Sequence, residues 1–197
     1  AQGLPVTLRL LDLAPDKHPM WASALPASSP LGVHGSRLYR HPLVRAVVDA
    51  QLQALAPLCQ RFDVGLLLPN VDSVEQFQHW QGLVKAALPD PGVSVGAMLE
   101  TGGAALAVDR FLATADLVGF GLNDLIQSLF GADRDLPAVR VQLDPYNPAL
   151  YRLLRAGHKV VMFVHDEVVV EISRLDDATE VAADVKRICC DAMESLT

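Results

Sequence analysis

DVGLLLP (63–69), VSVGAML (93–99) and DLVGFGL (116–122) are the stretches that decide the fold. Each is a short, continuous apolar run, which is the pattern of a strand buried on both of its faces. Stretches with helical spacing of apolar residues, at 74–88 and 102–113, separate the three runs. Buried strands that alternate with helices predict a parallel sheet built from βαβ units, and therefore an α/β fold.

The alternation extends to both sides of these runs. LPVTLRLLDL (4–13) favours a strand, and helices are predicted over 42–59 and 123–130. Asp72 and Glu75 form a D-x-x-E capping signal for the helix that follows them. Apolar residues of that helix recur at near-helical spacing and are expected in the core: Val74, Phe77, Trp80, Val84 and Leu88.

Composition narrows the class of protein. The chain has 197 residues with 51% hydrophobic and 20% charged side chains, which is typical of a globular domain rather than a disordered chain. Its net charge of −7 argues against a nucleic-acid partner, and it holds no apolar run long enough for a membrane span. Three cysteines, two of them adjacent, form no disulfide framework, so a reducing, cytoplasmic location is expected.

Polar residues follow three of the predicted strands. Arg9 and Asp12 end the first, Glu100 follows VSVGAML, and Asn123 and Asp124 follow DLVGFGL. Ligands of parallel sheets bind at the carboxyl ends of the strands, so these side chains are expected to meet. Two carboxylates suit Mg²⁺, which keeps its other positions for water and substrate oxygens. Taken alone, each acidic residue is better explained as a strand-end residue of no special function, such as a helix N-cap, and it is their joint occurrence at successive strand ends that favours a site.

Cationic and neutral donors complete this hypothesis. Arg9 and Arg134 would clamp a phosphate or carboxylate through bidentate hydrogen bonds, and Asn123 adds a neutral donor. The set suits a small phosphorylated acid bound through magnesium.

Six stretches in the right order resemble the phosphoenolpyruvate (PEP)-binding barrel of enzyme I of the sugar phosphotransferase system. They are TLRLLDLAPDK (7–17), SSPLGVHGSRL (28–38), LLLPNVDSVEQF (66–77), VGAMLETGGAALA (95–107), DLVGFGLNDLIQSLFGADRD (116–135) and YNPALYRL (146–153). The resemblance covers residues 1–157. It implies a (β/α)8 barrel. The fold expected for the whole chain is therefore α/β, with a partial (β/α)8 TIM-type barrel of about four to five units and a C-terminal β-hairpin and helix.

The resemblance also implies roles. Glu100 and Asp124 would ligate magnesium, Arg9 and Arg134 would hold the phosphoryl group, and Asn123 would assist as a catalytic residue. The parent activity is transfer of a phosphoryl group from PEP to a histidine on a separate domain, with release of pyruvate. The expected partners are therefore PEP or pyruvate and a phospho-accepting histidine domain.

Several departures from the family predict impaired or absent catalysis by this chain alone. His34, expected among the substrate-binding residues with Arg9, Asn123 and Arg134, stands in LGVHGSR where the family has an arginine that contacts phosphate. It lacks the guanidinium fork, so anion binding should be weaker. The donor histidine domain, the first barrel strand and the cysteine that protonates the product are expected to be missing. A non-catalytic PEP- or pyruvate-binding module, or an inert one, is the alternative.

Residues 158–197 differ from the rest. KVVMFVHDEVVVEI (159–172) predicts a hairpin, and the segment with its following helix resembles the C-terminal end of family A DNA polymerases, where Asp166 would be a catalytic carboxylate. Its net charge of −5 and the lack of a second aspartate motif argue against the alternative of a DNA polymerase fragment. The chain is thus interpreted as a chimera of two segments, 1–157 and 158–197.

Two further hypotheses concern this tail. His165 and Asp166 are either a solvated turn or a tail site, in which 159–164 fills the slot of the missing barrel strand and the two residues face the ligand. Partial barrels leave strand edges unpaired, so self-association into a homo-oligomer is also expected.

Overall fold

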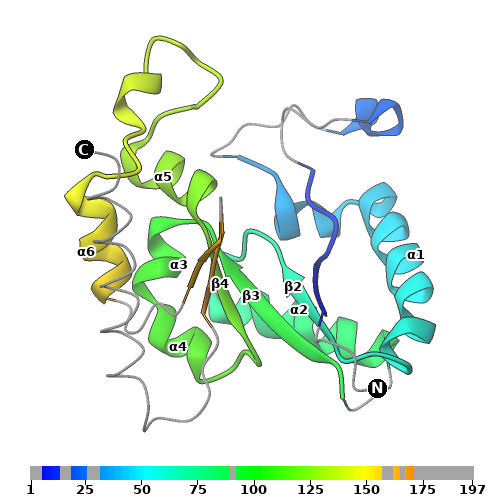
Figure 1. Ribbon diagram of the computed structural model, residues 1–197. Helices are drawn as coiled ribbons and strands as arrows, with labels where there is room; N and C mark the ends of the chain where they lie inside the picture. Colours follow the sequence, from blue (N-terminus) through cyan, green and yellow to red (C-terminus); the bar gives the residue numbers. More distant parts are fainter. Residues whose placement is uncertain are drawn as a thin grey trace, which may run out of the picture.

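A parallel sheet of four strands forms the centre of the molecule (Figure 1). The computed structural model describes residues 6–13, 19–25, 32–88, 92–156, 162–164 and 167–170. The strands are β1 (Val6–Arg9), β2 (Val64–Leu68), β3 (Ser94–Leu99) and β4 (Val118–Gly121), and they lie side by side in chain order. The apolar runs at 63–69, 93–99 and 116–122 are thus confirmed as the strands of a parallel sheet.

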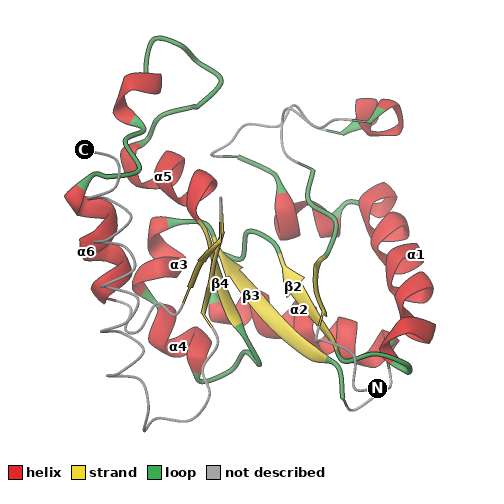
Figure 2. Cartoon of the chain, viewed as in Figure 1, coloured by secondary structure: helices red, strands yellow, loops and turns green. Residues whose placement is uncertain are grey.

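Helices alternate with these strands (Figure 2). They are η2 (Met20–Ala24), η3 (Gly35–Arg40), α1 (Pro42–Cys59), α2 (Val74–Ala87), α3 (Gly102–Leu106), α4 (Val108–Leu112), α5 (Leu122–Phe130), η4 (Arg140–Gln142) and α6 (Pro148–Ala156). The predicted helix over 42–59 is confirmed at both ends. The predicted helix over 102–113 is instead two short helices, because Ala107, with φ −94° and ψ 15°, leaves helical geometry between them.

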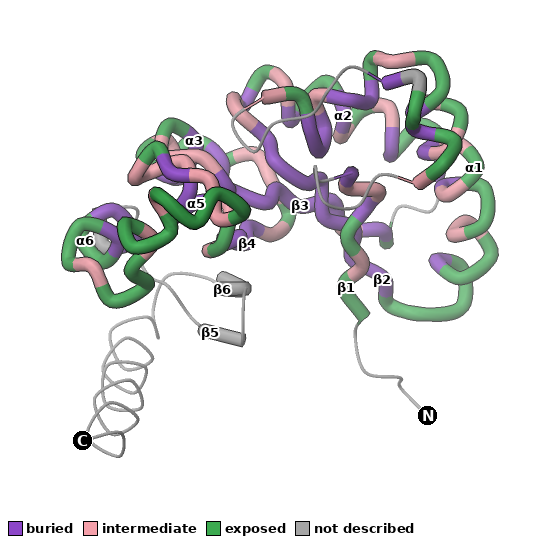
Figure 3. Tube along the Cα trace, turned by 90° about the horizontal axis from the view of Figure 1, so that it is seen from above, coloured by how far each residue is buried: buried purple, intermediate pink, exposed green. Residues whose placement is uncertain are grey.

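The sheet is curled, and helices cover its outer side (Figure 3). The result is a mixed α/β fold in which the four parallel strands form a half-barrel, so the expected partial barrel fits the structure. None of the helices in the described part of the chain is long and apolar enough to cross a membrane.

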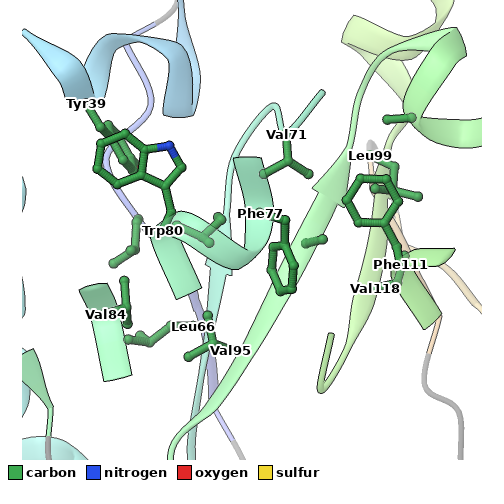
Figure 4. Packing of buried hydrophobic residues seen from close by; sticks show 14 of the residues in the cluster. Tyr39, Leu66, Val71, Phe77, Trp80, Val84, Val95, Leu99, Phe111 and Val118 are labelled. Carbon is green, nitrogen blue, oxygen red and sulfur yellow. The ribbon is translucent and has the colours of Figure 1, made fainter. Parts of the chain in front are cut away.

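The core lies between the sheet and its outer helices (Figure 4). The apolar residues expected along α2 are buried, and Phe77 is fully enclosed. Its ring meets that of Phe111 edge-on at 6.1 Å, while Trp80 meets Tyr39 in the same way at 5.4 Å. Such edge-to-face pairs add to the free energy of burial, so they fasten α2 to η3 through Tyr39 and to α4 through Phe111.

The N-terminus of α2 differs from the prediction. Ser73, not Asp72, is the N-cap residue, and its side chain accepts a hydrogen bond from the Gln76 N–H at 3.2 Å. The side chain of Asp72 is instead bound to Arg37, as described below. The carboxylate of Asp72 therefore binds an arginine beside a cavity rather than capping the helix.

The predicted hairpin is present as β5 (Met162–Val164) and β6 (Glu167–Val170), which pair with each other in antiparallel fashion. The hypothesis that 159–164 fills the slot of the missing barrel strand stays a prediction. In the described residues the position beside β4 is taken by β6, which runs antiparallel to it, and β5 lies beyond β6. An antiparallel partner can follow β5 through a tight turn, whereas a parallel one needs a long crossover. His165, Asp166 and the helix expected after residue 175 lie outside the described residues.

Candidate functional site

A cavity of about 350 Å³ lies beyond the carboxyl ends of β2, β3 and β4. Nine residues line it: His34, Arg37, Asn70, Asp72, Glu100, Thr101, Gly103, Asp124 and Ser128. We call Glu100, Thr101, Gly103, Asp124 and Ser128 the strand-end wall, because they follow β3 and β4. We call His34, Arg37, Asn70 and Asp72 the loop wall, because they come from η3, from the residue just before it and from the loop after β2.

Glu100 is the central group of the strand-end wall. It follows β3 directly, is 2% exposed, and its Oε2 accepts a hydrogen bond from the main-chain N–H of Asn70 at 2.6 Å. Gly121, the last residue of β4, lies against the Glu100 side chain, where a Cβ atom would come within 2.6 Å of Cγ. The missing side chain at 121 therefore makes room for the carboxyl group.

Burial and neighbouring negative charges both raise the pKa of Glu100. Its pKa is raised to about 8, first by burial and then by the negative charges of Asp12 and Asp124. The Asn70 N–H and Arg9 lower the pKa by smaller amounts. Like charges that crowd around one carboxyl group favour its protonated form, and a bound cation would relieve that crowding.

Asp124 lies in the first turn of α5, where the helix dipole favours a negative charge. Its Oδ1 accepts a hydrogen bond from Gln127 Nε2 at 2.9 Å. Gln127 Oε1 in turn accepts one from the Arg134 N–H at 2.8 Å. Gln127 is 2% exposed, so a buried amide fixes the position of Asp124 relative to the loop after α5.

The loop wall is held together by hydrogen bonds around Asn70. Its side-chain Nδ2 lies 2.7 Å from Nε2 of His34, and Ser36 Oγ donates to its carbonyl oxygen at 3.0 Å. Asn70 has φ 45°, a left-handed conformation that is uncommon outside glycine. Gly35 makes this possible, since a Cβ there would lie 2.6 Å from Cβ of Asn70.

Arg37 is bound firmly within the same wall. Its Nε and Nη2 donate to both carboxylate oxygens of Asp72, at 2.6 and 2.5 Å, and its Nη1 donates to the Gly32 carbonyl oxygen at 2.5 Å. The hydrogen bonds and charge of Asp72 raise the pKa of Arg37. All three guanidinium nitrogens of Arg37 are thus engaged by the protein.

The structure brings together only some of the predicted site residues. His34, Glu100 and Asp124 all line the cavity. Asn123 is exposed and does not line it. Arg9 lies outside the lining as well, with Nη1 3.8 Å from Asp12 Oδ2 and 3.9 Å from Met98 Sδ, although its charge reaches Glu100.

The remaining predicted residues are Arg134 and the tail pair. Arg134 is not among the lining residues. Its main-chain N–H donates a hydrogen bond to Gln127, which in turn holds Asp124. His165 and Asp166 are outside the described residues, so a tail site stays a prediction.

Three residues of the loop wall, Arg37, Asn70 and Asp72, were not predicted as site residues from the sequence motifs. Asn70 and Asp72 follow β2 in the same way that Glu100 follows β3, so the rule of strand-end polar residues points to them too. Arg37 stands in the quoted stretch LGVHGSR, but no local pattern links it to residue 72. Across the described residues, no group of three or more His, Cys, Asp or Glu side chains gathers to hold a metal ion alone.

Comparison with known proteins identifies the family of the chain. The family described as PEP-utilising enzyme, PEP-binding domain, matches residues 1–173. The chain belongs to this family. Phosphoenolpyruvate-protein phosphotransferases are similar to it: the protein of Priestia megaterium is 31% identical over 80% of the chain, and that of Cupriavidus necator is 33% identical over 77%. A multiphosphoryl transfer protein of Xanthomonas campestris is 29% identical over 78%.

The extent of these matches bears on the two predicted segments. The chain spans 28–30% of the length of the two phosphotransferases named above. The family match runs to residue 173, past the predicted boundary at 157, and the resemblance of 158–197 to DNA polymerases finds no support. The three-residue sequence HDE between two apolar stretches is too short a pattern to identify a polymerase. The domain boundary itself stays a prediction.

Proposed function

We propose that this chain is the PEP-binding part of a magnesium-dependent PEP–protein phosphotransferase, built on a partial TIM-type barrel. The parent reaction breaks the phosphorus–oxygen bond of PEP and forms a phosphorus–nitrogen bond on a histidine of another domain. The enol oxygen keeps the electron pair, and the product takes up a proton to become pyruvate. The acceptor histidine and the proton donor would come from outside the described site.

The observation that carries this proposal is the placing of Glu100 and Asp124 on one wall of a cavity, close enough for Asp124 to raise the pKa of Glu100. Two carboxylates fit the protein share of a Mg²⁺ site, and water and substrate oxygens fill the rest. The cation, when bound, would neutralise charge on the phosphoryl and carboxylate oxygens of the substrate.

Neighbouring residues hold the two carboxylates in position and influence their charge. The Asn70 N–H fixes one oxygen of Glu100, and Gln127 fixes one oxygen of Asp124, so both ligands are held before anything binds. Arg9 lies near enough to lower the pKa of Glu100 and so favours the ionised, cation-binding form. His34 takes the place of a phosphate-binding arginine, which supports the alternative of a site that binds PEP or pyruvate without catalysis.

Isothermal titration of PEP in the presence of Mg²⁺ tests the proposal. We expect binding by the intact chain, and a loss of more than about 100-fold in affinity for Glu100→Gln, which removes a ligand charge without changing the shape of the side chain. The matched control is Glu75→Gln, because Glu75 is an exposed glutamate on α2, paired with Arg110. No heat from the intact chain, or equal affinity in Glu100→Gln, would refute the proposal.

A further inference from the structure

Gln127 is a buried side chain that reaches two parts of the site at once. It lies in α5, in the turn after Asp124, and is 2% exposed. Its Nε2 donates to Asp124 Oδ1 at 2.9 Å, and its Oε1 accepts from the main-chain N–H of Arg134 at 2.8 Å. One amide group therefore links a proposed cation ligand to the loop that carries Arg134.

The chemistry of an amide fits both of these bonds. The ionised carboxylate of Asp124 can only accept hydrogen bonds, and the main-chain N–H of Arg134 can only donate one. A group that bridges them must donate at one end and accept at the other, as the Gln127 amide does. A methionine of similar size at position 127 would lose both bonds.

The main chain of Gln127 holds the beginning of the same loop. Gly131 ends α5 in a left-handed conformation with φ 60°, and its N–H donates to the Gln127 carbonyl oxygen. The N–H of Ala132, a residue that is 1% exposed, donates to the same oxygen at 3.2 Å. The chain thus turns back towards α5, which brings the Arg134 N–H to the Gln127 side chain. We call residues 131–134 the return turn.

The two ends of the Gln127 amide cannot move independently. The amide is planar, so Nε2 and Oε1 belong to one rigid group, and close packing around a buried side chain leaves that group little freedom. A shift of Asp124 would therefore turn the amide and disturb its bond to Arg134. Loss of either bond would leave a buried polar atom without a partner, which is unfavourable.

We infer that Gln127 is a positioning residue that couples the cation site to the return turn. A cation bound to Asp124 holds the Arg134 main chain more firmly, and a firmly held return turn strengthens cation binding. The two effects share one coupling free energy, so neither can be present without the other. This inference rests on the proposed function, and it names the residue through which two parts of that site act on each other. Gln127 itself does not line the cavity.

The experiment is amide hydrogen exchange at Arg134, followed by NMR in the intact chain with and without saturating MgCl₂. We expect the cation to slow this exchange about fivefold or more, which is the usual range of coupling between two sites. In Gln127→Met the exchange should be faster without the cation and should no longer respond to it. Affinity for Mn²⁺, measured by titration of MnCl₂, should fall about tenfold or more in the same variant, as for other residues that orient a metal ligand.

Two further variants separate this coupling from a general loss of structure, and thermal unfolding checks that each variant is folded. Asp124→Asn keeps an acceptor for Gln127 Nε2 but removes the charge. Its exchange at Arg134 should match the wild type without MgCl₂ and should not respond to MgCl₂. Gln81→Met is the matched control, because it removes the bond from Gln81 Nε2 to the Thr114 carbonyl oxygen at 3.3 Å, and neither residue lines the cavity. It should leave the exchange response and the Mn²⁺ affinity unchanged.

The outcomes separate this inference from the proposed function. A response that is present in the wild type and in Gln81→Met, and lost in Gln127→Met and Asp124→Asn, supports the coupling. If Mn²⁺ binds but exchange at Arg134 does not respond to MgCl₂, or responds equally in Gln127→Met, the inference is overturned and the proposed cation site stands. If the intact chain does not bind Mn²⁺, the proposed function is refuted and the inference with it. If Gln127→Met does not fold, Asp124→Asn decides, and a wild-type response in that variant overturns the inference.

Discussion

The two walls of the cavity are built in different ways. The strand-end wall consists of Glu100, which directly follows β3, and of residues in the segments after β3 and β4 up to α5. The register of the parallel sheet therefore places Glu100 and Asp124 at one edge. The loop wall depends on contacts between η3 and the loop after β2, which are 34 to 36 residues apart in the chain. The first wall carries the acidic groups of the proposed cation site, and the second determines how firmly one of them is held.

The two walls therefore have different roles: the strand-end wall carries the proposed cation ligands, and the loop wall holds one of them in place. Glu100 belongs to the strand-end wall, yet its Oε2 is bound by the main chain of Asn70 in the loop wall. A change in the loop wall is therefore expected to reach the cation site through one hydrogen bond. Changes in the strand-end wall are expected to act on the site directly and more strongly.

The largest expected effect is on cation affinity as a function of pH. The cation must displace the proton of Glu100, whose pKa is about 8, so affinity for Mn²⁺ should rise about tenfold for each pH unit from 6 to 8 and level off above 8. Titration of MnCl₂ at several pH values measures this. A flat profile between pH 6 and 8 would mean that Glu100 is not a cation ligand.

Stability without a cation should show the opposite trend. The folded chain holds the proton of Glu100 more tightly than the unfolded chain, whose carboxyl group has a pKa near 4.5. The contribution of Glu100 to the free energy of unfolding is therefore complete below pH 4.5 and is lost progressively as the pH rises to about 8. Glu100→Gln should remove this slope in urea denaturation and also the pH dependence of Mn²⁺ binding.

The next largest effect is expected from the substitution Gly121→Ala, which should lower stability and cation affinity. In Gly121→Ala the new Cβ would lie 2.6 Å from Cγ and 2.8 Å from Cδ of Glu100, which the Asn70 N–H prevents from moving freely. We expect a loss of about 1–3 kcal/mol in the free energy of unfolding, as for overpacked cores, together with weaker cation binding. Urea denaturation measures the first quantity and MnCl₂ titration the second.

Gly82→Ala is the matched control for this prediction. Gly82 lies in α2, and a Cβ there would meet no atom within 4 Å. Alanine in a helix interior is preferred over glycine by about 0.5–1 kcal/mol, so this variant should be more stable than the wild type and bind the cation unchanged. If both glycine variants behave alike, the close approach at Gly121 is not what shapes the Glu100 site.

Local patterns in the sequence were sufficient to predict the two carboxylates of the strand-end wall. Apolar runs and turn residues predict β2 to β4, and the polar residue after each strand points to Glu100 and Asp124. Periodicity predicts the buried face of α2, including Phe77 and Trp80. These features depend on residues that are close in the chain, where strand and helix periodicity apply directly.

The loop wall could not be predicted in the same way. The left-handed backbone of Asn70 depends on Gly35 packing against it, and the partner of Asp72 is an arginine 35 residues earlier. His34 was expected among the substrate-binding residues and lines the cavity, but its contact with the Asn70 amide could not be predicted from the sequence. Such contacts follow from tertiary packing, which overrides the capping signal at Asp72 and gives the cap to Ser73.

The smallest expected effect measures how much the Arg37–Asp72 pair holds the loop wall together. A double-mutant cycle with Arg37→Met and Asp72→Asn should give a coupling of about 1 kcal/mol in the free energy of unfolding, because the pair is bidentate and about two-thirds buried. Arg110 and Glu75, an exposed pair at 2.6 Å, should show no measurable coupling in the same cycle. Equal coupling in the two pairs would mean that burial adds nothing to the Arg37–Asp72 bond. The loop wall would then depend on Ser36 and His34, whose hydrogen bonds to Asn70 would be its remaining support.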